Sequence, residues 1–174
     1  MEAIRHFAYC GRCGAPAAGQ AENAGGPFRC AACGFTLFFN AAGAVGAIIR
    51  RPDGRALFVR RAKDPARGKL GLPGGFVDPG ENAEQALVRE VREEVGLELR
   101  NLQYLTSHAN RYAFAGVTYH TVDLFYTGDA DDASGAVPLD AVEAVEWHDP
   151  ATVPPDEIAF DSMRAALGAL RKKA

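Results

Sequence analysis

Hydrophobic positions along the chain follow two spacings, and each spacing predicts a different kind of element. Short apolar runs bounded by Gly, Pro and Asp are typical of strands. Such runs predict strands at residues 45–50, 56–60, 70–72, 97–106, 118–127 and 141–147. The turn sequence Pro52-Asp53-Gly54 separates the first two runs. It predicts that these two strands pair with each other, as a β-hairpin or as neighbouring strands.

Residues 82–95 instead show the spacing of an amphipathic helix. The apolar face is made by Ala83, Leu87, Val91 and Val95, with Val88 beside it. Asn82 can cap the first turn, and Gln85 three residues later makes a variant of the capping box. Gly96 follows the last apolar position and is expected to end the helix.

A second helix is expected after Pro154-Pro155, near the end of the chain. Its apolar stripe consists of Met163, Ala166, Leu167 and Leu170. The order of elements is therefore strands, helix, strands, helix. This order predicts an α/β fold in which helices pack on a mixed sheet.

Composition and charge restrict the class of protein. With 174 residues, 48% of them hydrophobic, the chain can form one full domain and a small appendage. No apolar run approaches the roughly 20 residues of a membrane span, and the first residues do not resemble a signal peptide, so a cytoplasmic protein is expected. The net charge of −3 gives no support for nucleic-acid binding, which calls for a basic surface.

Four cysteines lie in the first 33 residues as two CxxC pairs, Cys10 with Cys13 and Cys30 with Cys33. Two such turns can complete a tetrahedron of thiolates, and the spacing is typical of zinc sites. The sequence thus predicts a structural zinc ribbon at residues 1–40, followed by a second domain at 41–174. Free or oxidised thiols, a redox-active pair, and iron in the same cage are the alternatives.

A second face of the first predicted helix carries Glu90, Glu93 and Glu94. Carboxylates spaced at i, i+3 and i+4 repel one another, and a divalent cation would remove that repulsion. Oxygen ligands of this kind suit Mg²⁺ or Mn²⁺ better than zinc. Arg89 can support Glu93 through a salt bridge one turn away. A solvated acidic face, paired with Arg89 and Arg92, is the alternative.

Residues 75–97 match every fixed position of the Nudix box, G-x5-E-x7-R-E-U-x-E-E-x-G-U with U aliphatic. From roughly residue 40 to 170 the chain therefore resembles a Nudix hydrolase. This resemblance implies an α/β/α sandwich with a mixed sheet and the box at its centre. It also implies hydrolysis of a nucleoside diphosphate linked to another moiety, with Mg²⁺ or Mn²⁺ as the catalytic cofactor.

The resemblance also implies a role for each conserved position of the box. Glu90 and Glu94 would be direct metal ligands, and Glu93 a ligand or the general base. The carbonyl of Gly75 would be a further ligand. Glu81 would support the loop or contact a metal through water, and Arg89 would orient a glutamate. An acid from outside the box is also expected. Glu143 is the first candidate for it, and Glu146 and Asp140 are the alternatives.

A zinc ribbon before a Nudix domain is similar to the arrangement in NADH pyrophosphatases. That subfamily carries the motif S-Q-P-W-P-F-P-x-S, of which this chain keeps Ser107 and two aromatic residues but not the Gln, Pro and Trp. NADH, ADP-ribose or a related dinucleotide is therefore the expected substrate. The expected substrate-binding residues are Arg60, His108, Tyr112 and Phe114.

Two other functions stay open at this point. The first is a sanitising hydrolase that releases pyrophosphate from nucleoside triphosphates. The second is a non-catalytic nucleotide-sensing or RNA-binding module that uses the ribbon as its contact. The expected binding partner is a small nucleotide, and binding to a membrane or to nucleic acid is not expected. The family resemblance is compatible with a homodimer.

Overall fold

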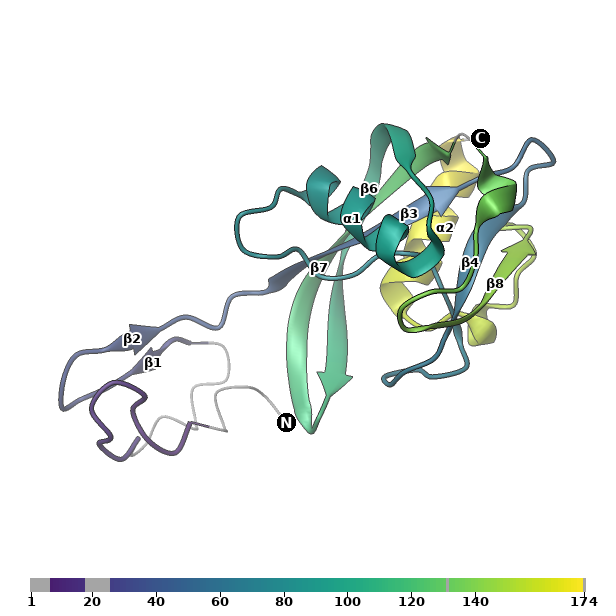
Figure 1. The fold of residues 1–174 in the computed structure, drawn as a ribbon. Coiled ribbons are helices and arrows are strands. Elements are labelled where there is room, and N and C mark those ends of the chain that lie inside the picture. Colours follow the sequence, from purple (N-terminus) through teal and green to yellow (C-terminus); the bar gives the residue numbers. More distant parts are fainter. Residues whose placement is uncertain (1–6, 18–25, 131, 174) are drawn as a thin grey trace. The chain divides into compact units, whose positions relative to one another are not determined.

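The chain forms two compact units. The computed structural model describes residues 7–17, 26–130 and 132–173 (Figure 1). The smaller unit comprises Met1–Ala41 with Arg111–His120, and the larger comprises Ala42–Asn110 with Thr121–Ala174. Two parts of the predicted ribbon, residues 1–6 and 18–25, lie outside the described residues. The assignment of residues 1–40 as a ribbon domain of its own stays a prediction.

Two three-stranded sheets organise the chain after residue 41. The first contains, in spatial order, β3 (Ala42–Ile49), β7 (Val117–Ala130) and β6 (Leu99–Phe114). The second contains β5 (Leu70–Gly71), β4 (Ala56–Arg61) and β8 (Val142–His148). β3 runs parallel to β7, whereas β4 is antiparallel to both of its neighbours. This mixed arrangement confirms the fold class that the sequence predicts.

The predicted pairing of the first two strands is wrong. β3 and β4 lie in different sheets. Where the end of β3 meets the start of β4, an isolated antiparallel bridge connects Arg50 and Ala56. Both strands carry consecutive buried residues rather than an alternating pattern. Strands that are buried on both faces take their partners from tertiary packing, so a local turn signal does not fix the pairing.

The hairpin of β6 and β7 is longer than the apolar runs predict. β6 continues to Phe114 and β7 begins at Val117, because the two strands are hydrogen-bonded neighbours in the sheet. Most residues of this extension are exposed, so they show no apolar spacing. Ala115 and Gly116, with φ of 49° and 81°, form the two-residue turn that reverses the chain.

The helix α1 (Ala83–Val95) begins and ends as the sequence predicts. The Asn82 side chain accepts a hydrogen bond from the Gln85 amide at 2.8 Å, and the Gln85 side chain accepts one from the Asn82 amide at 2.9 Å. Gly96 adopts the left-handed conformation with φ of 71° and caps the other end. This capped helix carries the predicted acidic face.

Two hydrophobic clusters pack on opposite sides of β3, as Figure 1 shows for α1 and α2 (Asp161–Lys173). The cluster beneath α1 includes Val45, Ala47, Ile49, Leu87, Val91 and Val95. The cluster beneath α2 includes Ile48, Phe58, Phe125, Ala166, Leu167 and Leu170. Successive residues of β3 therefore feed alternate clusters, which gives the α/β/α layering.

The last helix starts later than predicted. Pro155–Glu157 forms a short 3₁₀ turn, and Ile158 then bridges to Leu70 in an extended conformation. This bridge interrupts the helical path, so α2 begins at Asp161. None of the helices in the described residues is long and apolar enough to cross a membrane.

Candidate active and metal sites

The segment before α1 lies against β3 through backbone hydrogen bonds. The Val45 amide donates to the Gly75 carbonyl at 2.8 Å, and the Val77 amide donates to the Gly43 carbonyl at 3.0 Å. A side chain at Gly74 would collide with the Val45 carbonyl oxygen. A Cβ at Gly75 would lie 2.5 Å from the carboxyl carbon of Glu90. Gly74, with φ of 144°, has no room for a side chain against the backbone, whereas a side chain at Gly75 would displace the Glu90 carboxylate.

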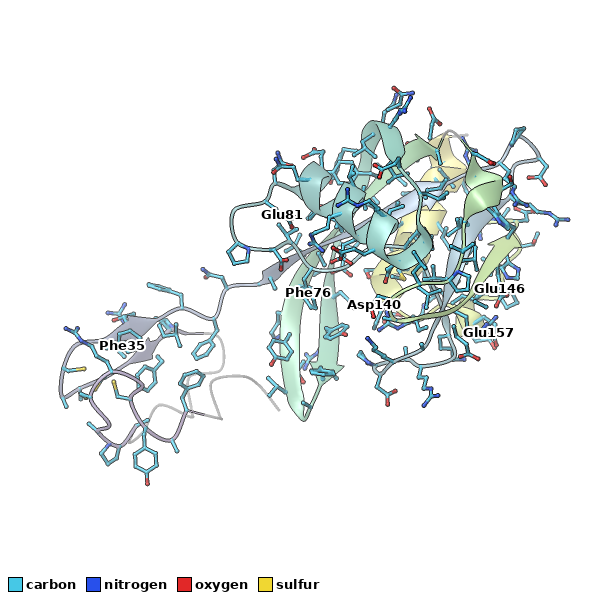
Figure 2. The ribbon with its side chains drawn as sticks, in the orientation of Figure 1. Phe35, Phe76, Glu81, Asp140, Glu146 and Glu157 are labelled. Atoms are coloured by element: carbon cyan, nitrogen blue, oxygen red, sulfur yellow. The ribbon has the colours of Figure 1, made fainter. Side chains whose placement is uncertain are left out.

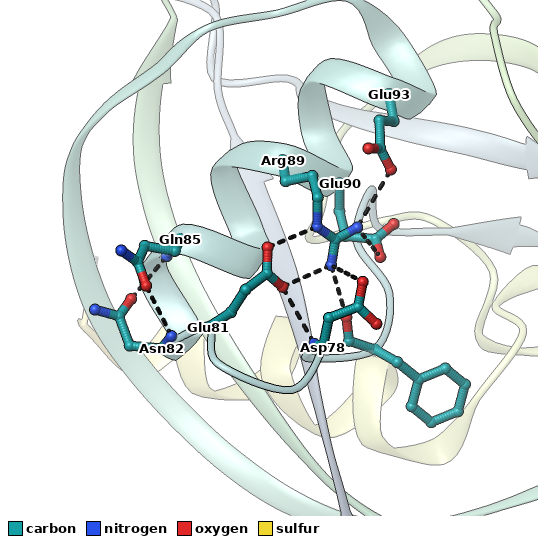
Figure 3. Close-up of polar contacts among 8 residues, drawn as sticks. Asp78, Glu81, Asn82, Gln85, Arg89, Glu90 and Glu93 are labelled. Carbon is teal, nitrogen blue, oxygen red and sulfur yellow. Dashed lines mark hydrogen bonds and ion pairs between the residues drawn. The ribbon is translucent and has the colours of Figure 1, made fainter.

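Arg89 connects three of the predicted glutamates (Figure 3). Its Nε and Nη2 donate to the two oxygens of Glu81 at 2.8 and 2.9 Å. Its Nη1 donates to Glu90 at 2.9 Å and to Glu93 at 3.2 Å. Nη2 also donates to the Phe76 carbonyl at 3.1 Å. One guanidinium thus fixes carboxylates from the loop and from two turns of α1.

These contacts shift the pKa values of the groups involved. The hydrogen bonds from Arg89 hold the pKa of Glu81 below its usual value, and they raise the pKa of Arg89 itself. For Glu90, burial outweighs the attraction of Arg89 and raises the pKa. Arg89 and the Asp78 amide therefore stabilise the ionised form of Glu81, whereas the ion pair with Arg89 does not offset the burial of Glu90.

Glu94 lies deeper in the fold than the other glutamates of the helix. Its Oε2 accepts a hydrogen bond from the Gly74 amide at 2.8 Å. Burial, with smaller contributions from the charges of Glu90 and Asp140, raises the pKa of Glu94 to about 8, while the Gly74 hydrogen bond and the charge of Arg61 oppose the shift. A divalent cation beside Glu90 and Glu94 would stabilise both ionised carboxylates. The donor set therefore fits a Mg²⁺ or Mn²⁺ ion.

The oxygen atoms of the glutamates lie farther apart than the sulfur atoms of the four cysteines. Within the described part of the chain, the four cysteines are the one group of three or more His, Cys, Asp or Glu side chains whose ligand atoms all lie within 4.8 Å of one another. The glutamates are held by Arg89 instead. The metal-ligand roles of Gly75, Glu81, Glu90, Glu93 and Glu94 stay predictions.

The cysteine sulfurs are spaced as a tetrahedral metal site requires. Cys10 Sγ lies 3.8 Å from Cys33 Sγ, and Cys13 Sγ lies 3.6 Å from Cys30 Sγ. Four sulfurs around a zinc ion, each about 2.3 Å from it, would be about 3.8 Å apart. The cluster thus has the geometry of a zinc ribbon and can hold a tetrahedral metal ion.

The two cysteine pairs sit in matching turns. The Gly14 amide donates to the Cys10 carbonyl and the Gly34 amide donates to the Cys30 carbonyl, each at 2.9 Å. Both glycines have φ of 72°, which a residue with a side chain adopts rarely. β1 (Phe28–Arg29) and β2 (Thr36–Leu37) form an antiparallel pair around the second turn.

The three candidate acids outside the box have different surroundings. Glu143 is exposed at a β-bulge, where the register of β4 and β8 shifts. Both oxygens of Glu146 bind Arg60, at 2.5 and 3.1 Å, which lowers the pKa of Glu146. The Asp140 amide donates to the Glu93 carbonyl, and its charge acts on Glu94. Asp140 (labelled in Figure 2) thus lies next to the end of α1, and the roles of all three acids stay predictions.

The four predicted substrate-binding residues are divided between the two units. Arg60 is engaged with Glu146 and with the Gly68 carbonyl at 2.7 Å. His108 lies on β6 with its Nε2 3.2 Å from the Thr106 hydroxyl. Tyr112 and Phe114 belong to the smaller unit, with ring centroids 6.4 Å apart. Their roles in binding stay predictions.

Sequence reasoning missed one charged residue near this site. Lys63 Nζ lies 3.2 Å from Asp140 Oδ1. The two residues are 77 positions apart, so no local spacing pattern could have connected them. Of the basic residues in this part of the chain, the sequence analysis selected Arg60 and not Lys63.

The family model described as NUDIX domain matches residues 41–167. The chain belongs to the NUDIX family. It is 29% identical over 167 residues to the NAD-capped RNA hydrolase NudC of Chromobacterium violaceum, covering 94% of this chain and 59% of that protein. Over 63 residues it is 44% identical to an ADP-ribose pyrophosphatase of Methanocaldococcus jannaschii, covering 36% of this chain and 37% of that protein.

Solved structures show the same NUDIX fold. A MutT NUDIX hydrolase from Burkholderia pseudomallei is 30% identical, with a TM-score of 0.65 and coverage of 75% of this chain and 98% of that one. The NUDIX domain of Shewanella oneidensis NrtR, complexed with ADP ribose, is 25% identical, with a TM-score of 0.62 and coverage of 78% and 90%. The chain spans 51–59% of the length of the NudC relatives that match most of it.

Proposed function

We propose that this NUDIX protein is a Mg²⁺- or Mn²⁺-dependent pyrophosphatase. Its substrate would be ADP-ribose, NADH or a related dinucleotide, and its products a nucleoside monophosphate and a second phosphorylated compound. The observation that carries the proposal is the Arg89 cluster, in which one guanidinium orients Glu81, Glu90 and Glu93. Partly buried Glu90 and Glu94 beside it have raised pKa values, which calls for a cation.

Each residue of the cluster has a distinct task in this proposal. Glu90 and Glu94 would hold the cation, which would neutralise phosphate oxygens and make water a better nucleophile. Arg89 keeps these carboxylates in place before substrate arrives. The Glu93 side chain is 52% exposed, so water can reach it. We assign Glu93 to accept the proton of the attacking water, with metal ligation as its alternative role.

The proposed substrate is chosen from what related proteins are named for and from the chemical class of their ligands. The relatives include an ADP-ribose pyrophosphatase and NAD-capped RNA hydrolases, and the related NrtR domain was solved with ADP ribose. All of these ligands contain a diphosphate between two nucleoside or ribose groups. We further propose that Zn²⁺ fills the cysteine site and holds the ribbon together, because the sulfur spacing matches a tetrahedral zinc ion.

A hydrolysis panel tests the proposal. The substrates are NADH, NAD⁺, ADP-ribose, diadenosine polyphosphates and nucleoside triphosphates, each with Mg²⁺ and with Mn²⁺. Glu94→Gln is the inactive comparison. We expect metal-dependent AMP release from ADP-ribose or NADH that is lost in the variant.

Two other results would replace the proposal. Pyrophosphate release from nucleoside triphosphates alone would establish the sanitising activity. Tight metal binding without turnover of any substrate would favour a nucleotide-sensing module.

A further inference from the structure

Two loops meet at the rim of the carboxylate site. One consists of residues 62–69, between β4 and β5, and the other of residues 137–141, before β8. The Ala62 amide donates to the Ala141 carbonyl at 2.9 Å. Next to this bond, Lys63 Nζ lies 3.2 Å from Asp140 Oδ1. The ammonium of Lys63 therefore joins the first loop to the second.

The second loop is attached to the end of α1 that carries the acidic residues. The Leu139 amide donates to the Glu94 carbonyl at 2.9 Å, and the Asp140 amide donates to the Glu93 carbonyl at 3.3 Å. The charge of Asp140 also contributes to the raised pKa of Glu94. Lys63 thus pairs with Asp140, whose loop is hydrogen-bonded to Glu93 and Glu94, two glutamates of the proposed site.

The first loop has internal bonds that hold it in shape. The Gly68 amide donates to the Arg61 carbonyl at 2.8 Å, and Arg61 Nε donates to the Pro65 carbonyl at 2.9 Å. Arg60 Nη1 donates to the Gly68 carbonyl at 2.7 Å. The loop that carries Lys63 is therefore held in shape, and the exposed Lys63 side chain reaches out of it to its ion pair with Asp140.

The charges around the site leave a role for this side chain. The guanidinium of Arg89 is already shared among Glu81, Glu90 and Glu93, so it is not available to a ligand. The side chains of Lys63 and Asp140 are 66% and 77% exposed. Ion pairs as exposed as this one are weak and exchange easily. A phosphate oxygen accepts the same charge-assisted hydrogen bond as a carboxylate oxygen, so a bound phosphate can compete with Asp140 for the ammonium.

We propose that Lys63 is a phosphate-recognition residue of this site. In the free protein its ammonium rests on Asp140, and on binding it moves to a phosphate oxygen of the substrate. This inference rests on the proposed function and adds a determinant of specificity to it. Ligands with more phosphate charge near the rim gain more from Lys63 than ligands with less.

Calorimetric binding of methylenediphosphonate, a diphosphate analogue that cannot be hydrolysed, tests the inference in the presence of Mg²⁺. We expect Lys63→Gln to raise the Kd about five- to tenfold, and Lys63→Arg to restore most of the affinity because it keeps the charge. Lys172→Gln removes an exposed lysine charge from the end of α2 and should leave the Kd unchanged. Mn²⁺ affinity, measured without the diphosphonate, should be the same in all four proteins.

Three results would overturn the inference. The first is equal diphosphonate affinity in wild type and Lys63→Gln. The second is a loss of Mn²⁺ affinity in Lys63→Gln, which would place Lys63 on the carboxylates instead of the phosphate. The third is the absence of diphosphonate binding to the wild type. Failure of the proposed function is read separately, because it shows as lack of turnover in the hydrolysis panel.

Discussion

Arg89 and Arg92 lie one turn apart on α1 but differ in what they contact. Arg89 binds Glu81, Glu90 and Glu93, whereas Arg92 reaches Glu98 at 4.0 Å in an exposed pair. We expect Arg89→Lys to lower kcat about 100-fold, because a lysine cannot hold several carboxylates in a fixed geometry. Arg92→Lys is the matched control, and steady-state kinetics should show less than a twofold change. Similar losses in both variants would contradict the positioning role of Arg89.

Glu94 predicts how stability depends on pH when no divalent cation is added. Its pKa in the folded protein is about 8, above the value of about 4.3 expected in the unfolded chain. The folded state therefore binds more protons between these values, and stability falls as pH rises through that window. Glu94→Gln removes the effect and keeps an oxygen for the Gly74 amide.

Thermal melts of the two proteins from pH 5 to 9 measure this. At pH 8.5 we expect the variant to melt at least about 2 °C above the wild type, and the gap should close near pH 5. Added Mn²⁺ should stabilise the wild type and not the variant. A gap that stays constant with pH would show that Glu94 is not the titrating group.

At the scale of elements, the turn before α1 is as important as the helix. Gly75→Ala would place a Cβ 2.5 Å from the carboxyl carbon of Glu90 and force that side chain to move. We expect Mn²⁺ affinity to fall at least about tenfold while the circular dichroism spectrum is preserved, since Arg89 and Glu90 form a linked arrangement. Gly168→Ala is the control, because a Cβ there has nothing within 4 Å. Unchanged Mn²⁺ affinity in Gly75→Ala would contradict this geometry.

Local signals in the sequence predicted α1, and non-local contacts escaped prediction. The caps at Asn82 and Gly96 depend on neighbours within four residues, so the sequence pattern contains them. The partner of β3 is β7, so that Ala42 pairs with Thr121, and no local turn signal reports a contact so distant in the sequence. The same limit applies to Lys63 and Asp140, whose contact exists because two loops converge after folding.

At the scale of the whole molecule, each unit has its own source of stability. The larger unit has two hydrophobic clusters made by residues 45–170, and the smaller has a cluster around Phe28 and the cysteines. We expect Cys10→Ser with Cys13→Ser to reduce bound zinc from one ion per chain to near zero, as measured by mass spectrometry of the metal. Residues 7–41 should then become sensitive to proteolysis, because a small unit depends on its metal.

Hydrolysis by the same double variant separates two roles for the ribbon. The clusters beneath α1 and α2 include none of the cysteines, so the carboxylate site should survive the loss of zinc. We therefore expect kcat for the preferred panel substrate to stay within about threefold of the wild type. The matched control, Ser134→Ala, leaves both clusters and the cysteines intact. A parallel loss of zinc and of turnover would mean that the metal-bound ribbon is part of the catalytic arrangement.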